Sequence, residues 1–196
     1  ALPFVALQIS QVVLLDADVF FANTFMSPDE AGYVAAFSLI QRVQFFACFG
    51  LTSILLPSVA SAVANGESGF VKFVPVAALF VGVSIFVLAI LNIAPEMVLK
   101  IVVGAEYIAA SPELPLAGFS AVAFTFSYLS ATFLVALGDR RGTWLVLAFV
   151  PIQMATFYLL GTGDAGMSLS SLLVAKSYCQ AALSLLLLLM IIKLLI

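Results

Sequence analysis

Long apolar runs alternate with short polar interruptions along the whole chain. Each run is long enough for a helix that crosses a bilayer, which needs about 20 apolar residues. The interruptions are rich in proline, glycine and charge, which mark helix ends. The pattern predicts an all-α integral membrane protein in which residues 1–196 form a single six-transmembrane-helix bundle. The predicted spans are residues 2–25, 32–63, 71–93, 114–137, 143–160 and 167–196.

One segment between the third and fourth spans, residues 96–110, is too short and too polar to cross. Its apolar residues fall at helical spacing, which predicts a short helix lying in the membrane interface.

The basic residues indicate the orientation of the bundle. With six spans, both termini and the loops near 65–72 and 138–142 share one side of the membrane. That side holds Lys72, Arg140, Arg141 and Lys193. The other side holds Lys100 and most of the acids. Because Lys and Arg favour the cytoplasmic side, we expect both termini of this segment in the cytoplasm and residues 96–110 outside.

Composition excludes several classes of function. Hydrophobic residues make up 64% of the 196 residues and charged residues 9%, against about 25% charged in soluble domains. The chain has no histidine, so it lacks an imidazole base and a histidine metal ligand. Its seven basic residues are scattered, which argues against a nucleic-acid partner. We therefore expect no enzyme, no metal and no other cofactor.

Four charged residues lie inside the predicted spans: Asp16, Asp18, Arg42 and Lys176. A charge at the bilayer centre costs at least roughly 2.5–3.5 kcal/mol, so each is a candidate functional residue. Asp16 and Arg42 are equally far along the chain from Asp29 at the tip of the first hairpin (29 − 16 = 42 − 29), and Lys176 enters from the same outer side. All four then occupy one layer, and their charges sum to zero.

This charged layer has two interpretations. It lines a hydrated cavity that binds an ion or an anionic headgroup, or it consists of ion pairs that hold the helices together. Asp16 and Asp18 are separated by about 200° around a helix, so they do not face the same cavity. The face that Asp18 shares with Gln11 favours Asp18 as the cavity-facing acid.

Polar residues on several helices support a wet interior, although polar contacts between packed helices are the alternative. Gln41 adjoins Arg42, and Gln180 lies near serines at seven-residue spacing. The candidate cavity-lining residues are Arg42, Lys176, Asp18, Asp16, Gln41 and Gln180. Pro57 removes a backbone hydrogen bond within the second helix, and is a candidate hinge or a static kink.

Several short motifs follow one another along residues 16–140. Asp18 precedes the stretch SPDEAGYVAA at 27–36, and Leu56-Pro57, VGAEYIAA at 103–110 and LVALGD at 134–139 follow. This order resembles the second half of polysaccharide-export flippases, the Wzx-type O-antigen and oligosaccharide transporters of the multidrug/oligosaccharidyl-lipid/polysaccharide (MOP) superfamily. These carry an aspartate before "speeaGxYaaa", then "fP", "fGxxYxxA" and "LxAxG". The match covers about residues 16–140.

The resemblance implies half of a twelve- or fourteen-helix transporter, built from two six-helix bundles around a cavity that opens alternately to each side. The expected substrate is a polyprenyl-pyrophosphate-linked oligosaccharide, flipped from the cytoplasmic to the outer leaflet during surface polysaccharide (lipopolysaccharide) biosynthesis. Arg42 and Lys176 are then candidates for contact with the pyrophosphate. The other partners implied are membrane lipid and either a missing N-terminal six-helix half or a second copy. The implied location is a bacterial or archaeal cytoplasmic (inner) membrane.

Two other functions stay open. In a drug/cation antiporter of the same superfamily, Asp16 or Asp18 would bind the coupling Na⁺ or H⁺; Arg42 and Lys176 at the same depth argue against it. In a non-transporting membrane scaffold, the charges would serve as interhelical locks.

Overall fold

The computed structural model describes residues 2–164 and 166–195. Within these ranges the chain forms seven α-helices and one 3₁₀ helix. They are α1 (Leu2–Phe25), α2 (Pro28–Ala64), α3 (Phe70–Ile93), α4 (Pro95–Val102), η1 (Ala105–Glu113), α5 (Leu114–Ala136), α6 (Arg141–Thr162) and α7 (Leu169–Leu195). Six helices in the described part are long and apolar enough to cross a membrane, which fits a multi-pass membrane protein. Ile196, the predicted end of the last span, lies outside the described residues.

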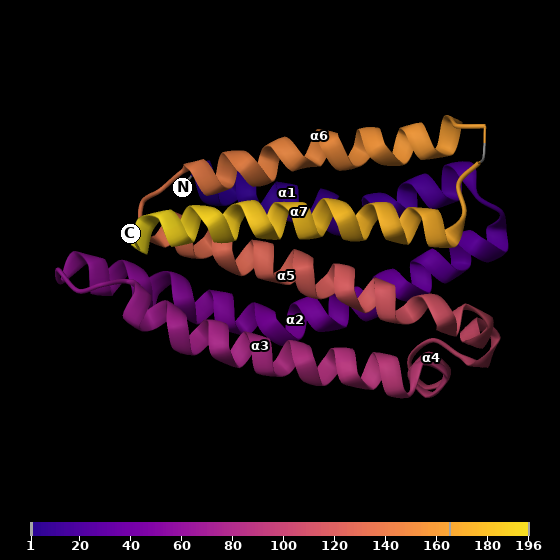
Figure 1. Cartoon of the computed structure of the whole chain (residues 1–196), viewed down its shortest axis with the longest axis horizontal. Helices are drawn as coiled ribbons and strands as arrows, with labels where there is room; N and C mark the ends of the chain where they lie inside the picture. The colour runs from indigo at the N-terminus through magenta and orange to yellow at the C-terminus, as the bar shows by residue number, and fades with distance from the viewer. Residues whose placement is uncertain (1, 165, 196) are drawn as a thin grey trace.

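The long helices run side by side along the molecule (Figure 1). Both chain termini, the α2–α3 turn and the α5–α6 loop lie at one end, here called the terminus end. The α1–α2 turn, the short helix α4 and the α6–α7 connection lie at the opposite end, here called the α4 end. This grouping of the loops is the one that six antiparallel spans predict, and it places the basic loop residues at the terminus end.

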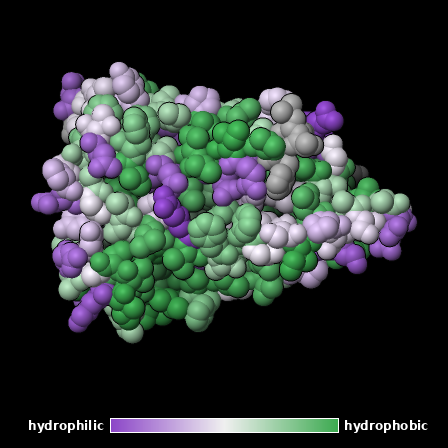
Figure 2. Space-filling view, turned by 180° about the vertical axis from the view of Figure 1, so that it is seen from behind, coloured by the Kyte–Doolittle hydropathy of each residue, from purple (hydrophilic) through white to green (hydrophobic). Residues whose placement is uncertain are grey.

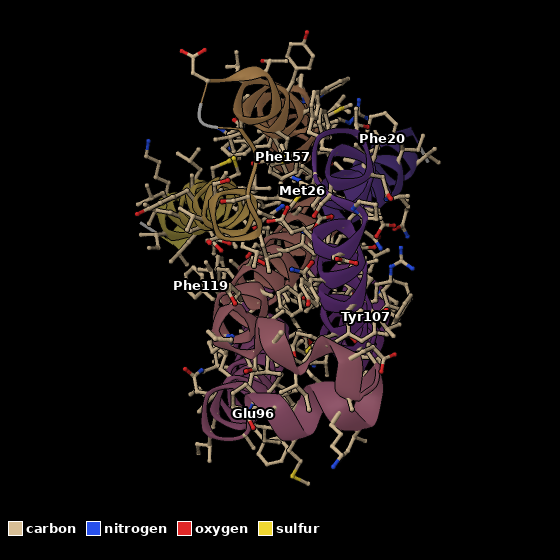
Figure 3. The ribbon with its side chains drawn as sticks, turned by 90° about the vertical axis from the view of Figure 1, so that its right-hand side faces the viewer. Phe20, Met26, Glu96, Tyr107, Phe119 and Phe157 are labelled. Carbon is tan, nitrogen blue, oxygen red and sulfur yellow. The ribbon has the colours of Figure 1, made fainter. Side chains whose placement is uncertain are left out.

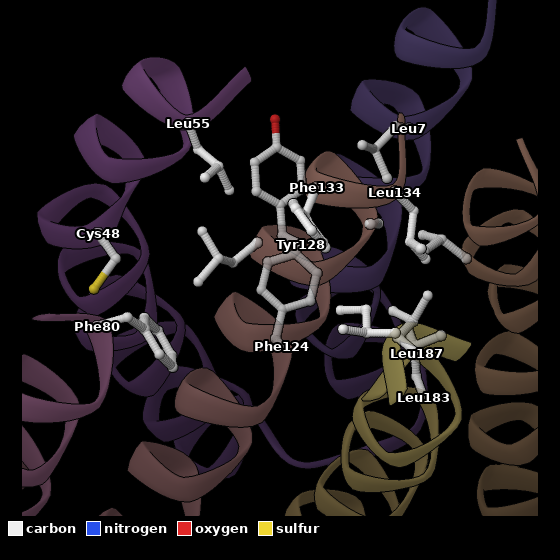
Figure 4. Close-up of a cluster of buried hydrophobic side chains, with 14 of the residues drawn as sticks. Leu7, Cys48, Leu55, Phe80, Phe124, Tyr128, Phe133, Leu134, Leu183 and Leu187 are labelled. Carbon is white, nitrogen blue, oxygen red and sulfur yellow. The ribbon is translucent and has the colours of Figure 1, made fainter. Parts of the chain in front are cut away.

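α5 is the central helix of the bundle. In the most apolar window of the span that contains it, 72% of the residues are buried, against 17% for α3. Its aromatic side chains Phe124, Tyr128 and Phe133 form the middle of a core that α1, α2, α3 and α7 enclose (Figure 4). Small residues such as Ala117 and Gly118 on the same helix are fully or largely buried, which lets neighbouring helices approach closely.

The α1–α2 hairpin begins its second helix with a side-chain cap. The Ser27 hydroxyl accepts a hydrogen bond from the Glu30 backbone N–H at 3.4 Å, and Pro28 occupies the first helical position. A serine cap followed by proline and acids is typical of a helix start. The first motif of the resemblance is therefore, physically, a helix N-terminus.

A second loop, at the terminus end, starts α6. Asp139 accepts a hydrogen bond from the Arg141 backbone N–H at 2.9 Å and forms an ion pair with its guanidinium at 2.8 Å. The Arg141 side-chain hydrogen bond lowers the pKa of Asp139. The aspartate is therefore ionised near neutral pH, where it stabilises the positive end of the helix dipole.

The sequence predicts one short helix over residues 96–110, but the segment between α3 and α5 consists of two elements separated at Gly104. α4 ends at Val102, and η1 begins at Ala105. Gly104 has φ +124° and ψ 164°, a combination that is essentially restricted to glycine. α4 buries Leu99 and exposes Met97 and Ile101, so one side of this short helix is apolar and uncovered.

We expect Gly104→Ala to lower the free energy of unfolding by about 1–3 kcal/mol, the cost of holding a side chain in this backbone region. An added Cβ would also lie 2.7 Å from Glu106 Oε2. The midpoint of thermal unfolding in lipid nanodiscs measures the change. Gly82→Ala is the matched control, because a Cβ there meets nothing within 4 Å. Equal midpoints for the two variants would contradict the strain argument.

Candidate functional site

The two aspartates of α1 point to opposite sides of that helix, as their spacing predicts. Asp18 is 1% exposed and lies inside the bundle. The side chain of Asp16 is 34% exposed and lies on the surface. Each pairs with a different base, so the four charged residues form two separate ion pairs.

The inner pair joins Asp18 to Lys176 of α7. The Lys176 ammonium donates to Asp18 Oδ2 at 2.6 Å, to Gln41 Oε1 at 2.6 Å and to the backbone carbonyl of Leu15 at 2.9 Å. An ammonium has three protons, so its hydrogen-bonding capacity is filled. Because Lys176 is 1% exposed, its charge is enclosed by α1, α2 and α7.

Glutamines extend this buried cluster to the remaining core helices. Gln41 donates to Ser120 Oγ of α5 at 3.0 Å. Gln180 of α7 donates to Gln153 of α6 at 2.7 Å, and Gln153 donates to the Leu14 carbonyl of α1 at 2.9 Å. Polar bonds therefore join α1, α2, α5, α6 and α7 to one another. The sequence identified Gln41 and Gln180 but gave no functional role to Ser120 or Gln153, since an isolated polar residue on an apolar helix carries no partner information.

Two buried acceptors in this cluster have no hydrogen-bond partner within the described ranges: Asp18 Oδ1 and Gln180 Oε1. Lys176 is consequently the one residue in this cluster whose charge neutralises the Asp18 carboxylate. Removing that single partner would leave a carboxylate buried without compensation.

The outer pair joins Asp16 to Arg42 of α2. Arg42 Nη2 and Nε donate to Asp16 Oδ1 at 2.8 Å and 3.1 Å. The Ser38 hydroxyl lies 3.5 Å from the same oxygen. The side chain of Arg42 is 45% exposed, so this pair is accessible from the outer surface of α1 and α2.

The outer pair lies near the middle of the membrane-spanning part of α1. The span Val5–Phe25 has 21 residues, about 31 Å at a rise of about 1.5 Å per residue, and the hydrocarbon core is about 30 Å thick. Asp16 lies nine residues before the end of this span (25 − 16), or about 14 Å. An exposed ion pair at this depth is unusual on a surface that contacts lipid.

The space-filling view shows the face on which α1 and α2 are nearest the viewer (Figure 2). Hydrophilic side chains gather midway along this face, with apolar side chains on either side. At this depth α1 and α2 contribute the exposed or half-buried charged residues Asp16 and Arg42. We call these two residues the polar face.

Seen from the α4 end, Phe20 of α1 and Tyr107 of η1 lie on one side of the bundle, and Phe119 of α5 lies on the other (Figure 3). The second side is apolar: Phe119 and Tyr178 line a groove of about 300 Å³ between α5 and α7. Phe20 follows Asp16 by four residues on α1 and therefore shares its helical face, so the polar face and this groove lie on different sides of the molecule.

The proline, the cysteines and the metal-ligating residue types that the sequence offers are placed as follows. Pro57 lies in a continuous α2 that runs from Pro28 to Ala64, and its role as a hinge stays a prediction. Cys48 and Cys179 are free thiols. No group of three or more metal-ligating side chains occurs among the described residues.

Comparisons with protein-family models, with curated proteins and with solved structures find no match for this chain. The assignment of function therefore rests on the resemblance of short motifs and on the geometry of the two ion pairs.

Proposed function

We propose that this chain is one half of an alternating-access membrane transporter, and that its polar face lines the substrate path. The observation that carries the proposal is the Asp16–Arg42 pair, 34% and 45% exposed near the middle of the span. Charges at this depth face a bundle interior or a water-filled cavity, because contact with lipid is costly. A second six-helix bundle opposite α1 and α2 supplies the missing wall.

The proposed substrate is a lipid-linked oligosaccharide with a pyrophosphate headgroup. The support is the order of the motifs that resemble the C-terminal half of Wzx-type flippases of the MOP superfamily. Two of these motifs also meet in space: the rings of Tyr33 and Tyr107 lie 6.1 Å apart, edge to face. In this proposal Arg42 binds the pyrophosphate.

Lys176 has a different role in the proposal. Its ammonium is enclosed by Asp18, Gln41 and the Leu15 carbonyl, which leaves it no free donor for a ligand. We therefore assign Lys176, Asp18, Gln41 and Gln180 to holding the bundle together as one moving body, and Asp16 and Arg42 to the substrate path.

The proposed orientation puts the terminus end in the cytoplasm of a bacterial or archaeal cell, because that end carries the basic loops. Helix α4, with Met97 and Ile101 exposed, then lies in the outer interface of the cytoplasmic membrane. The headgroup crosses the polar cavity while the polyprenyl tail stays in lipid.

The test is Arg42→Gln in cells whose surface polysaccharide depends on this protein. We expect export to fall at least about tenfold, the effect of removing a charged hydrogen-bond partner of the substrate, while the amount of protein in the membrane stays unchanged. Lys100→Gln, a basic residue outside the polar face, is the matched control and should export normally. Normal export by the Arg42 variant at normal abundance would overturn the proposal.

A further inference from the structure

The outer ion pair uses less than its full bonding capacity. Both hydrogen bonds from Arg42, and the contact from Ser38, converge on Asp16 Oδ1. Among the described residues, Asp16 Oδ2 and Arg42 Nη1 make no hydrogen bond. The exposed Arg42 guanidinium therefore keeps one edge free for another acceptor. Its Nε–Nη2 edge donates to the Asp16 carboxylate.

A guanidinium binds a phosphate-class oxyanion best through two parallel N–H bonds. An anion that takes the Nε–Nη2 edge has to displace Asp16, because both need the same donors. An anion that takes the free edge lies within a few ångströms of the Asp16 carboxylate, and like charges repel at that distance. Asp16 opposes the anion in either geometry.

We infer that Asp16 is a specificity-determining residue of the substrate path, acting as a built-in competitor of the ligand for Arg42. This inference rests on the proposed function and adds the residue that sets its selectivity. A group with several charged oxygens, such as pyrophosphate, replaces the carboxylate; a neutral lipid headgroup or a single carboxylate does not. Without a ligand, Asp16 neutralises Arg42, so that the empty site carries no net charge inside the membrane while the protein changes conformation.

Anion binding to the purified protein in lipid nanodiscs tests this role. The probes are geranyl pyrophosphate, which carries a short prenyl tail, and inorganic pyrophosphate. Asp16→Asn keeps the shape of the side chain and removes its charge, and we expect it to tighten binding about fivefold, the factor that an exposed ion pair supports. Arg42→Gln should abolish binding. Asp29→Asn, an exposed acid at the α4 end, is the matched control and should bind like the wild type.

The two probes distinguish the source of the anion. Tighter binding of both by the Asp16 variant supports competition for the anion alone, and tighter binding of geranyl pyrophosphate only supports competition for a lipid-borne headgroup. Unchanged or weaker binding of both, with binding still lost in Arg42→Gln, overturns the competitor role and leaves the proposed function standing. Equal binding by the wild type and Arg42→Gln overturns both. Asp16→Ser provides a second variant, and unfolding midpoints verify that each variant is folded.

Discussion

Replacing Lys176 by methionine is expected to remove about 3–5 kcal/mol from the free energy of unfolding, because it leaves one charge of a buried pair without its partner. The partner is Asp18, 1% exposed. Lys176 bonds its Oδ2, and its Oδ1 has no hydrogen-bond partner within the described part of the chain. The loss should appear as a lower unfolding midpoint in nanodiscs and as a smaller amount of protein in the membrane.

The double variant Lys176→Met with Asp18→Asn should recover most of this loss, since replacing both members of a buried pair is often close to neutral. Arg42→Met is the matched control for depth: it breaks a pair that is open to the proposed water-filled cavity, where the remaining Asp16 carboxylate stays hydrated, and should cost less than about 1 kcal/mol. A Lys176 variant that unfolds at the wild-type midpoint would show that the inner pair does not hold the bundle together.

The second large effect is expected for Phe133→Ala, at about 3–5 kcal/mol, the usual cost of emptying a buried phenylalanine site. Phe133 is 0% exposed, and its ring stacks on Phe73 with centroids 4.2 Å apart and meets Phe70 at 5.1 Å. These contacts attach the first turns of α3 to α5. Chemical denaturation in nanodiscs measures the loss of stability, and protease cleavage in the 65–69 turn measures the release of α3.

Phe126→Ala is the control for this substitution. It removes the same ring from the same helix at a partly exposed position, where the ring centroids of Phe126 and Phe80 are 5.8 Å apart. The truncation of Phe133 should destabilise the protein clearly more than that of Phe126. Equal losses would mean that attachment of α3 does not depend on this stack.

Helix number and helix ends follow from the sequence because they are local properties. The runs of apolar residues and the turns at Ser27 and Gly138 determine them, and the six long helices begin and end within about one turn of the predicted spans. The break at Gly104 inside residues 96–110 is not predicted. Periodicity also separates Asp16 from Asp18 by direction. These inferences need no knowledge of which helices are neighbours.

The partners of the charged residues depend on helix order in space, which periodicity does not contain. The sequence favoured Asp18 as the cavity-facing acid because it shares a helical face with Gln11; in the structure Asp18 points into the six-helix bundle and Asp16 reaches the surface. The reason is helix packing: α1 packs against α6, α2 and α5, so its Asp18 side is enclosed and its Asp16 side reaches the surface. Gln153 was similarly unassignable, since its partners Leu14 and Gln180 come from two other helices.

The pairing of every mid-depth charge has an electrical consequence. Moving one elementary charge through the membrane field is worth about 2.3 kcal/mol per 100 mV. Because Asp18–Lys176 and Asp16–Arg42 are each neutral as pairs, rotation of the whole bundle moves no net protein charge at this depth across the field. In the proposed transporter, the membrane potential would act on the cycle through the charge of the bound cargo. The sign and size of that charge would favour one direction of loaded transport, and the return of the unloaded bundle would be almost voltage-independent.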